Sequence, residues 1–196
     1  LNERVSIFSF LPDSKRPDIT GSASDVTEEV QRALDELYLK NTRKGNLESR
    51  VALYFPAGEY LVSSSLKVPP FATLIGAGKG KTKITGIDSG IFTTVNEDSE
   101  PGSYQGNVTA TNENQPRYIY MSGMTLYTET NGGALLLQSC KNSVFENLEF
   151  EGNWTSSFSS STDYPAIKMT SASSLVTCDQ NEFRNIDIKK LKIFVG

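Results

Sequence analysis

The chain has 196 residues, of which 37% are hydrophobic and 21% are charged, and its formal net charge is −4. An acidic chain without a basic stripe is not expected to bind nucleic acid, because phosphate contacts need clustered lysine and arginine, and no apolar run is long enough for membrane insertion. The absence of histidine excludes imidazole-based nucleophile systems and histidine-ligated zinc. We expect neither a metal nor a cofactor, and a calcium site on the carboxylates Glu149 and Asp187 is the weaker alternative.

A lead-in segment over residues 1–24 precedes the first regular element, with one short strand expected over 5–10. Residues 25–40 are predicted to form a helix, because apolar residues recur there at spacings of three and four and make one stripe. Asp25 or Thr27 can cap this helix. The segments that follow this helix in the sequence all show strand patterns, so the apolar stripe of the helix must pack on strands.

Residues 50–196 are predicted to be short strands separated by turns. The first of these strands cover 51–55, 59–62, 65–68 and 72–75. Because no second helical pattern follows, a doubly wound sheet is excluded and a sandwich, barrel or solenoid is left. The glycine-rich segment 76–80 is predicted to be a turn and not a phosphate loop, since Ile75 stands where the Walker pattern needs glycine and no helix follows.

Three segments in the second half of the chain share one pattern, and they cover 121–126, 145–150 and 183–188. Each reads apolar, polar, Gly or Asn, apolar, polar, apolar. Successive segments begin 24 and 38 residues apart. Repeats of roughly 20 to 50 residues are typical of solenoids and related arrays, so the repeat favours stacked coils.

The third position of the repeat predicts a sharp bend in each coil. It is occupied by Gly123, Asn147 and Asn185, residue types that tolerate a left-handed backbone. Cys140 and Cys178 each precede their segment by five residues, so we expect their sulfurs to be neighbours on adjacent coils. Parallel Cβ vectors suit a disulfide poorly, and free thiols are the preferred interpretation, with a disulfide as the alternative.

Three segments resemble the pectate-lyase-like β-helix proteins. Residues 25–35 resemble the opening helix of that family, 53–62 resemble its strand followed by Phe-Pro-x-Gly-x-Tyr, and 66–80 resemble the next coil. The resemblance implies an all-β fold, a single-stranded right-handed parallel β-helix with an N-terminal capping helix over 25–40. It also implies a homotrimer. We expect the coils over 50–196 to continue in a longer protein.

The resemblance is less specific for function, because this opening occurs in phage tailspikes and tail fibres and in secreted polysaccharide lyases and hydrolases. Our first expectation is a structural, host-glycan-recognising segment of a phage tail protein, found in the virion or outside the cell. The alternative is a polysaccharide-degrading enzyme, either a lyase or a glycoside hydrolase. A third possibility is a scaffold with neither role. Fold alone does not choose among them.

The best catalytic candidates are two carboxylates, because sugar hydrolysis needs a pair. Glu149 and Asp187 occupy matching outward positions on successive coils. Such closeness can raise the pKa of one carboxyl and make it an acid. The competing interpretation is that they are ordinary surface carboxylates of an acidic chain.

A polar insert over 151–165 supplies the ligand-binding candidates, since loops on a rigid scaffold often carry function. They are Asn153, Trp154, Phe158, Asp163 and Tyr164. The aromatic rings can stack on a sugar, and the Asn and Asp side chains can bond its hydroxyl groups. The alternative is that the aromatic residues pack on a neighbouring coil or a partner subunit. A second polar insert covers 96–117.

Overall fold

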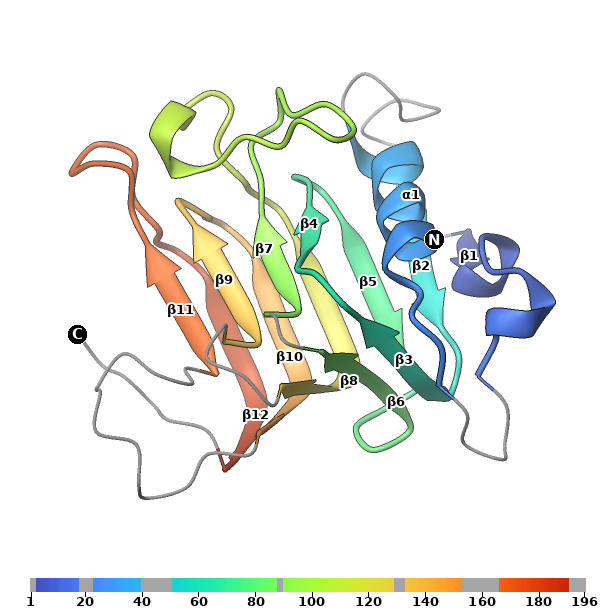
Figure 1. Cartoon of the computed structure of the whole chain (residues 1–196). Helices are drawn as coiled ribbons and strands as arrows, with labels where there is room; N and C mark the ends of the chain where they lie inside the picture. The colour runs from blue at the N-terminus through green and yellow to red at the C-terminus, as the bar shows by residue number, and fades with distance from the viewer. Residues whose placement is uncertain are drawn as a thin grey trace.

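The computed structural model describes residues 3–17, 23–39, 51–87, 90–128, 133–152 and 166–190. Within these ranges the chain is a right-handed parallel β-helix with one α-helix at its N-terminal end (Figure 1). The described strands form two sheets, and every strand pairing in them is parallel. The predicted all-β solenoid is therefore confirmed.

The larger sheet, sheet A, bends partway along its longer strands. It contains β1 (Arg4–Ser6), β2 (Ala52–Phe55), β3 (Gly58–Val62), β5 (Thr73–Gly76), β6 (Thr82–Gly86), β8 (Tyr120–Thr128), β10 (Val144–Gly152) and β12 (Glu182–Lys189). Sheet B contains β4 (Leu66–Val68), β7 (Phe92–Thr94), β9 (Leu135–Gln138) and β11 (Ile167–Thr170). The chain winds through β2-β3-β4, β5-β6-β7, β8-β9 and β10-β11, and β12 follows on sheet A.

The predicted overlay of the three repeated segments is confirmed by the strand register. Leu148 of β10 lies opposite Met124 of β8 on one side and opposite Ile186 of β12 on the other. The chain therefore returns to the equivalent position after 24 and then 38 residues. The longer step holds the insert predicted over 151–165, although Glu151 and Gly152 still belong to β10.

The predicted bend is also confirmed. Gly123, Asn147 and Asn185 have φ angles of 71°, 52° and 48°, all in the left-handed region. The Asn185 amide donates a hydrogen bond of 2.7 Å to the side-chain oxygen of Asn147, so the bends stack. The turn after β5 packs back on this bend, since a Cβ on Gly76 would lie 2.2 Å from the Gly123 carbonyl oxygen. Strand β6, and not a helix, follows that turn, as predicted.

The inward residues of successive coils stack into a continuous core. Leu53, Leu74, Met121 and Phe145 are fully buried on adjacent strands of sheet A. The Phe145 ring stacks on Phe183 of the next coil at 5.3 Å between centroids. Burying each such side chain stabilises the fold by roughly 1.5–3 kcal/mol.

Helix α1 (Thr27–Tyr38) covers the N-terminal end of the coils (Figure 1). Its stripe of Val30, Ala33 and Leu34 is buried against the core, as the periodicity predicted. The N-cap is Val26, which makes no side-chain capping bond, so neither Asp25 nor Thr27 occupies the predicted cap position; the Asp25 carboxylate, one residue before the N-cap, accepts the Thr27 backbone N–H at 3.0 Å.

The same end of the solenoid exposes strand edges, and residues around α1 pair with them. The Val26 N–H donates to the Leu61 carbonyl at 2.9 Å, and the Leu61 N–H donates to the Ser24 carbonyl at 3.3 Å. The Tyr38 hydroxyl accepts the buried N–H of Leu53 at 3.0 Å. These bonds satisfy backbone groups that an open edge would leave unpaired.

The lead-in differs from the strand predicted over 5–10. Strand β1 ends at Ser6, and a 3-10 turn covers Ile7–Ser9. The Ser6 hydroxyl accepts the Phe8 N–H at 3.2 Å, and this local bond favours the turn over continued pairing. Further 3-10 turns cover Asp13–Lys15 and Asn107–Thr109. Cys140 and Cys178 are both free thiols, which is the interpretation that the sequence favoured over a disulfide.

Candidate functional site

The two predicted carboxylates are direct neighbours on sheet A. Glu149 in β10 and Asp187 in β12 are Cα partners in the strand register, and Thr125 of β8 continues the row. The Thr125 hydroxyl donates to the Glu149 carboxylate at 3.2 Å. Glu149 is only 9% exposed, whereas Asp187 is exposed. The register therefore brings the pair together, but the two side chains differ in their access to solvent.

Each of the two carboxylates is paired with a lysine. Asp187 accepts from the Lys79 ammonium at 2.9 Å, and Lys79 also donates to the Asn185 amide oxygen at 3.2 Å. Glu149 forms an ion pair with Lys189 of β12. Lys79 comes from the turn between β5 and β6, which places a residue from an early coil over β12.

The charge pairing determines what Asp187 can do chemically. The hydrogen bond and charge of Lys79 lower the pKa of the Asp187 carboxyl below its ordinary value. A general acid in glycoside cleavage needs a raised pKa, so that it holds a proton near neutral pH. Asp187 in this arrangement is suited to act as a base or a charge partner, and not as the acid.

The predicted ligand-binding residues lie outside the described residues. Asn153, Trp154, Phe158, Asp163 and Tyr164 all fall in the 153–165 segment. This segment joins β10 to β11 in the chain. Their role stays a prediction.

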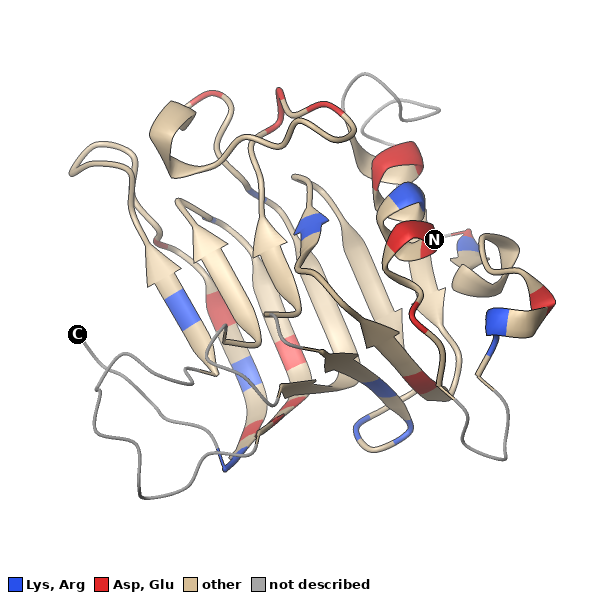
Figure 2. Cartoon of the chain, in the orientation of Figure 1, with Lys and Arg blue, Asp and Glu red and all other residues tan. Residues whose placement is uncertain are grey.

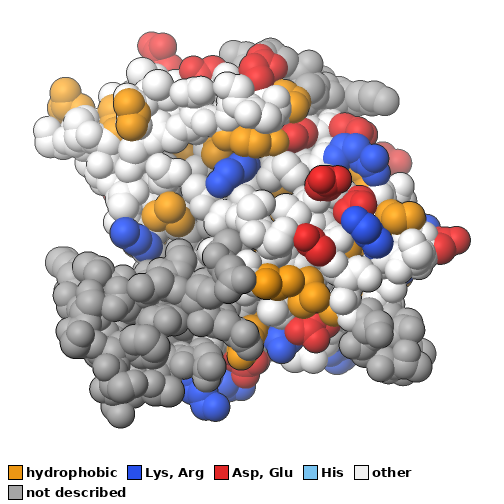
Figure 3. Space-filling view, in the orientation of Figure 1, with side chains coloured by type: hydrophobic (Ala, Val, Ile, Leu, Met, Phe, Trp, Pro, Cys, Tyr) orange, Lys and Arg blue, Asp and Glu red, His pale blue; other side chains and the backbone are white. Residues whose placement is uncertain are grey.

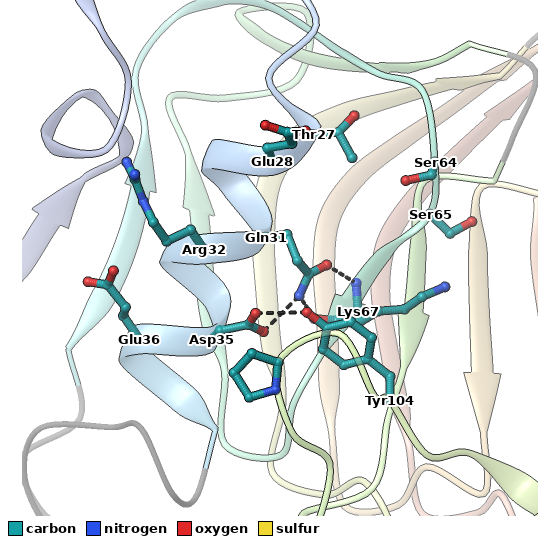
Figure 4. Close-up of a pocket in the computed structure, with 11 residues that line it drawn as sticks. Thr27, Glu28, Gln31, Arg32, Asp35, Glu36, Ser64, Ser65, Lys67 and Tyr104 are labelled. Atoms are coloured by element: carbon teal, nitrogen blue, oxygen red, sulfur yellow. Dashed lines mark hydrogen bonds between the residues drawn. The ribbon is translucent and has the colours of Figure 1, made fainter.

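A groove of about 530 Å³ lies beside α1, and sequence reasoning missed it (Figure 4). Residues of α1, residues 64–67 at the start of β4 and the 101–104 part of the second insert line it. Gln31, Asp35 and Tyr104 meet within it: the Tyr104 hydroxyl donates to Asp35 at 2.7 Å, and the Gln31 amide donates to Asp35 at 2.9 Å. This network ties the insert to the helix.

Burial dominates the electrostatics of this groove. It raises the pKa of the Asp35 carboxyl, against the hydrogen bonds from Tyr104 and Gln31, which lower it. Burial, followed by the hydrogen bond to Asp35, raises the pKa of Tyr104 to about 12. The phenol therefore remains a proton donor to Asp35 across the physiological range.

A second groove, of about 260 Å³, adjoins the first and shares Lys67 and Tyr104 with it. It lies over sheet B, between β7, β9 and residues 104–108. Burial lowers the pKa of the Lys67 ammonium, and no acid in the described part of the chain opposes this shift. The ammonium makes no hydrogen bond or ion pair with any residue that the structure describes.

The outward face of sheet B carries basic and neutral side chains. In register across its strands lie Lys67, Thr93, Leu136 and Lys168. None of the four strands contains Asp or Glu, and Figure 2 shows blue but no red along them. In Figure 3 this surface is mostly uncharged, with isolated basic groups. Lys67 could have been noticed in the sequence only as a polar residue between Leu66 and Val68.

Comparison with protein families identifies the fold group. Residues 17–190 match the model of the family described as "Rhamnogalacturonase A/epimerase, pectate lyase-like". The chain belongs to this pectate lyase-like family. The match covers the helix and every described strand except β1, and it confirms the resemblance inferred from the opening helix and the first coils.

One solved structure with a similar fold is ORF18 of Geobacillus virus E2. The similarity has a TM-score of 0.50 at 18% sequence identity, and it covers 74% of this chain and 25% of the phage protein. The matched region is thus about a quarter of that protein's length. Comparison with curated proteins gives no match.

In the described ranges, no helix combines the length and apolar character needed to cross a bilayer. The same ranges contain no group of three or more acidic or cysteine side chains placed to hold a metal ion.

Proposed function

We propose that this chain is a glycan-recognising segment of a phage tail-type protein and that it holds the glycan on the outward face of sheet B. Membership of the pectate lyase-like family and a fold shared with a phage protein support the proposal. The observation that carries it is Lys67, a partly buried ammonium without a partner among the described residues, shared by two adjoining grooves.

The chemistry of the face suits an extended saccharide. Thr93 contributes a hydroxyl group to the groove beside Lys67, and Gln138 contributes an amide that also bonds the backbone of Asn107 and Thr94. Adjacent strands lie about 4.8 Å apart, so a chain that crosses the strands passes from Lys67 to Lys168. A carboxylate or phosphate group on the glycan would restore the charge interactions that Lys67 lacks.

The test is binding of host capsule or lipopolysaccharide glycans to the immobilised chain. Lys67→Gln should weaken binding by about tenfold, as expected for loss of one charge-assisted hydrogen bond. Lys81→Gln, the same charge change on the exposed turn of sheet A, is the matched control and should leave binding nearly unchanged. Equal losses in both variants would show nonspecific attraction and reject the site.

The alternative is a polysaccharide-degrading enzyme that uses Glu149 and Asp187. The specific observation in its favour is that these carboxylates are register partners on adjacent strands. Release of reducing ends or unsaturated products from the same glycans tests it. Activity that disappears in Glu149→Gln and Asp187→Asn would support the enzyme, and no release by the wild-type chain would reject catalysis by this segment.

The proposal includes a homotrimer in the virion or outside the cell, as the family resemblance implies. Sedimentation velocity tests this part separately. A single monomeric species across the accessible protein concentrations would reject trimer formation by this chain.

A further inference from the structure

The corner that leads into β5, β8, β10 and β12 carries a second ladder of left-handed residues. They are Phe71, Tyr118, Asn142 and Gln180, with φ angles of 68°, 54°, 50° and 53°. The bridges that pair Arg117 with Lys141, and Lys141 with Asp179, place the preceding residues in register. Tyr118, Asn142 and Gln180 therefore follow one another along the same corner, about 4.8 Å apart.

Two of these four positions hold residue types that rarely adopt a left-handed backbone conformation. The left-handed region suits Gly and Asn, and a bulky side chain there is strained. Asn142 fits the rule, whereas Phe71 and Tyr118 do not. Such strain persists where surrounding structure enforces it, and it concentrates at ligand contacts.

The two aromatic rings form a supported platform. Tyr118 stacks on Phe71 with centroids 5.7 Å apart and an interplanar angle of 22°. Phe71 is only 7% exposed, while Tyr118 is 49% exposed. The Arg117 guanidinium lies 5.1 Å from the Phe71 ring centre and is held by an ion pair with Glu97. The Tyr118 ring is thus fixed from below and open to solvent.

Unused hydrogen-bonding groups stand beside the platform. The side-chain amides of Asn142 and Gln180 form no hydrogen bond with any residue in the described ranges. Each amide offers two donors and one acceptor. The exposed ring of Tyr118 therefore offers a ligand an apolar face, and the Asn142 and Gln180 amides beside it offer hydrogen-bond donors and acceptors.

We propose that Tyr118 is a stacking platform for a neutral sugar ring, whose hydroxyl groups bond the Asn142 and Gln180 amides. The ring carbons of a pyranose cover the aromatic face, and its hydroxyl groups project sideways to the amides. This second site rests on glycan recognition as the chain's function, but it uses different residues from the Lys67 grooves. We expect the stacked sugar to be uncharged, because the residues that follow Tyr118 along the corner carry amides and the nearby Arg117 guanidinium is already paired with Glu97.

The experiment is a titration followed by nuclear magnetic resonance of carbon-13-labelled tyrosine rings. The probes are the methyl glycosides of glucose, galactose, rhamnose and galacturonic acid. Tyr118 should show a saturable shift with at least one neutral glycoside. Tyr104 reports on the Lys67 groove in the same spectra, so the two sites succeed or fail separately.

Variants separate binding from folding. Because Tyr118→Asn also removes the probe ring, binding to this variant is followed by saturation transfer to the glycoside, which should be lost while the unfolding temperature stays equal or rises, since Asn tolerates the left-handed backbone. Gln180→Ala, at an exposed amide, should weaken binding about threefold through one lost hydrogen bond. No saturable Tyr118 shift with any glycoside overturns the proposal. So does a change of sedimentation coefficient in Tyr118→Asn, which would make the platform a subunit contact.

Discussion

The side-chain amide of Gln31 pairs with the backbone of Lys67 as a neighbouring strand would. Its oxygen accepts the Lys67 N–H at 2.7 Å, and its nitrogen donates to the Lys67 carbonyl at 3.1 Å. Lys67 lies in β4, the edge strand of sheet B. One helix residue thus completes the hydrogen bonding of that edge residue, and it positions the backbone of a lysine whose ammonium has no partner among the described residues (Figure 4).

Replacing Gln31 tests this pairing. Gln31→Met keeps the length of the side chain but leaves both Lys67 backbone groups without their partner, so we expect a loss of roughly 1–3 kcal/mol in unfolding free energy. Urea unfolding followed by circular dichroism measures it. Glu36→Ala, at an exposed site on the same helix, is the control and should change stability by less than about 0.5 kcal/mol. Similar losses in both would indicate a general helix effect.

The left-handed bend at Asn185 can be tested with two variants. Asn185→Ala keeps a Cβ in this left-handed backbone but loses the side-chain amide that lets Asn adopt it, so it should cost roughly 1–2 kcal/mol. Asn185→Gly keeps the conformation and loses only the amide contacts with Asn147 and Lys79. The glycine variant should therefore be the more stable of the two in chemical denaturation. The reverse order would mean that the left-handed backbone at this position does not favour glycine, and it would contradict the prediction.

Two aspartates at the helix should give opposite pH dependence. Burial raises the pKa of Asp35 above its ordinary 3.8, so its contribution to stability grows as pH falls through that raised value towards 3.8. Burial would also raise the pKa of Asp25, but hydrogen bonds from Ser63 and Thr27 outweigh it and lower the pKa. The Asp25 contribution is present above 3.8 and is lost as pH falls through the lowered value.

The measurement is unfolding free energy from about pH 7 to about pH 3 for Asp35→Asn and Asp25→Asn. The stability of Asp35→Asn relative to wild type should decline as pH falls, because only the wild type gains unfolding free energy from protonation of Asp35. The stability of Asp25→Asn relative to wild type should rise as pH falls, because only the wild type loses the contribution of the ionised Asp25. Parallel pH profiles for the two variants would contradict the assigned directions.

The stacked cysteines should be chemically inert in the folded protein. Burial raises the pKa of the Cys140 thiol to about 12 and also raises that of Cys178. Thiolates react and thiols do not, so iodoacetamide should label neither residue quickly at pH 8 until denaturant is added, and Cys178 should react first because it is less buried. An intact mass lower by two hydrogens would reveal a disulfide and contradict the prediction.

The repeat pattern predicted the stacking of coils, because inward apolar residues and left-handed bends recur at equivalent positions. Gly123, Asn147 and Asn185 show it, since their residue types alone indicate the backbone that each adopts. The second ladder was missed, because Phe71 and Tyr118 are residue types that ordinarily avoid this conformation. Tertiary packing enforces it against their local preference.

The candidate sites also contain features that the sequence predicts and features that depend on tertiary packing. The adjacency of Glu149 and Asp187 follows from the repeat, because strand register carries equivalent positions to neighbouring strands. The pairing of these carboxylates with Lys79 and Lys189 does not follow from the repeat, since Lys79 lies 108 residues before Asp187 in the sequence.

The sequence alone determined the coil pattern, the capping helix and the family, because these depend on local periodicity and residue type. Only the tertiary structure decided which charges are neutralised, that two grooves meet at the partly buried Lys67, and that Tyr118 is half-exposed, because burial and partners depend on chain segments brought together by folding.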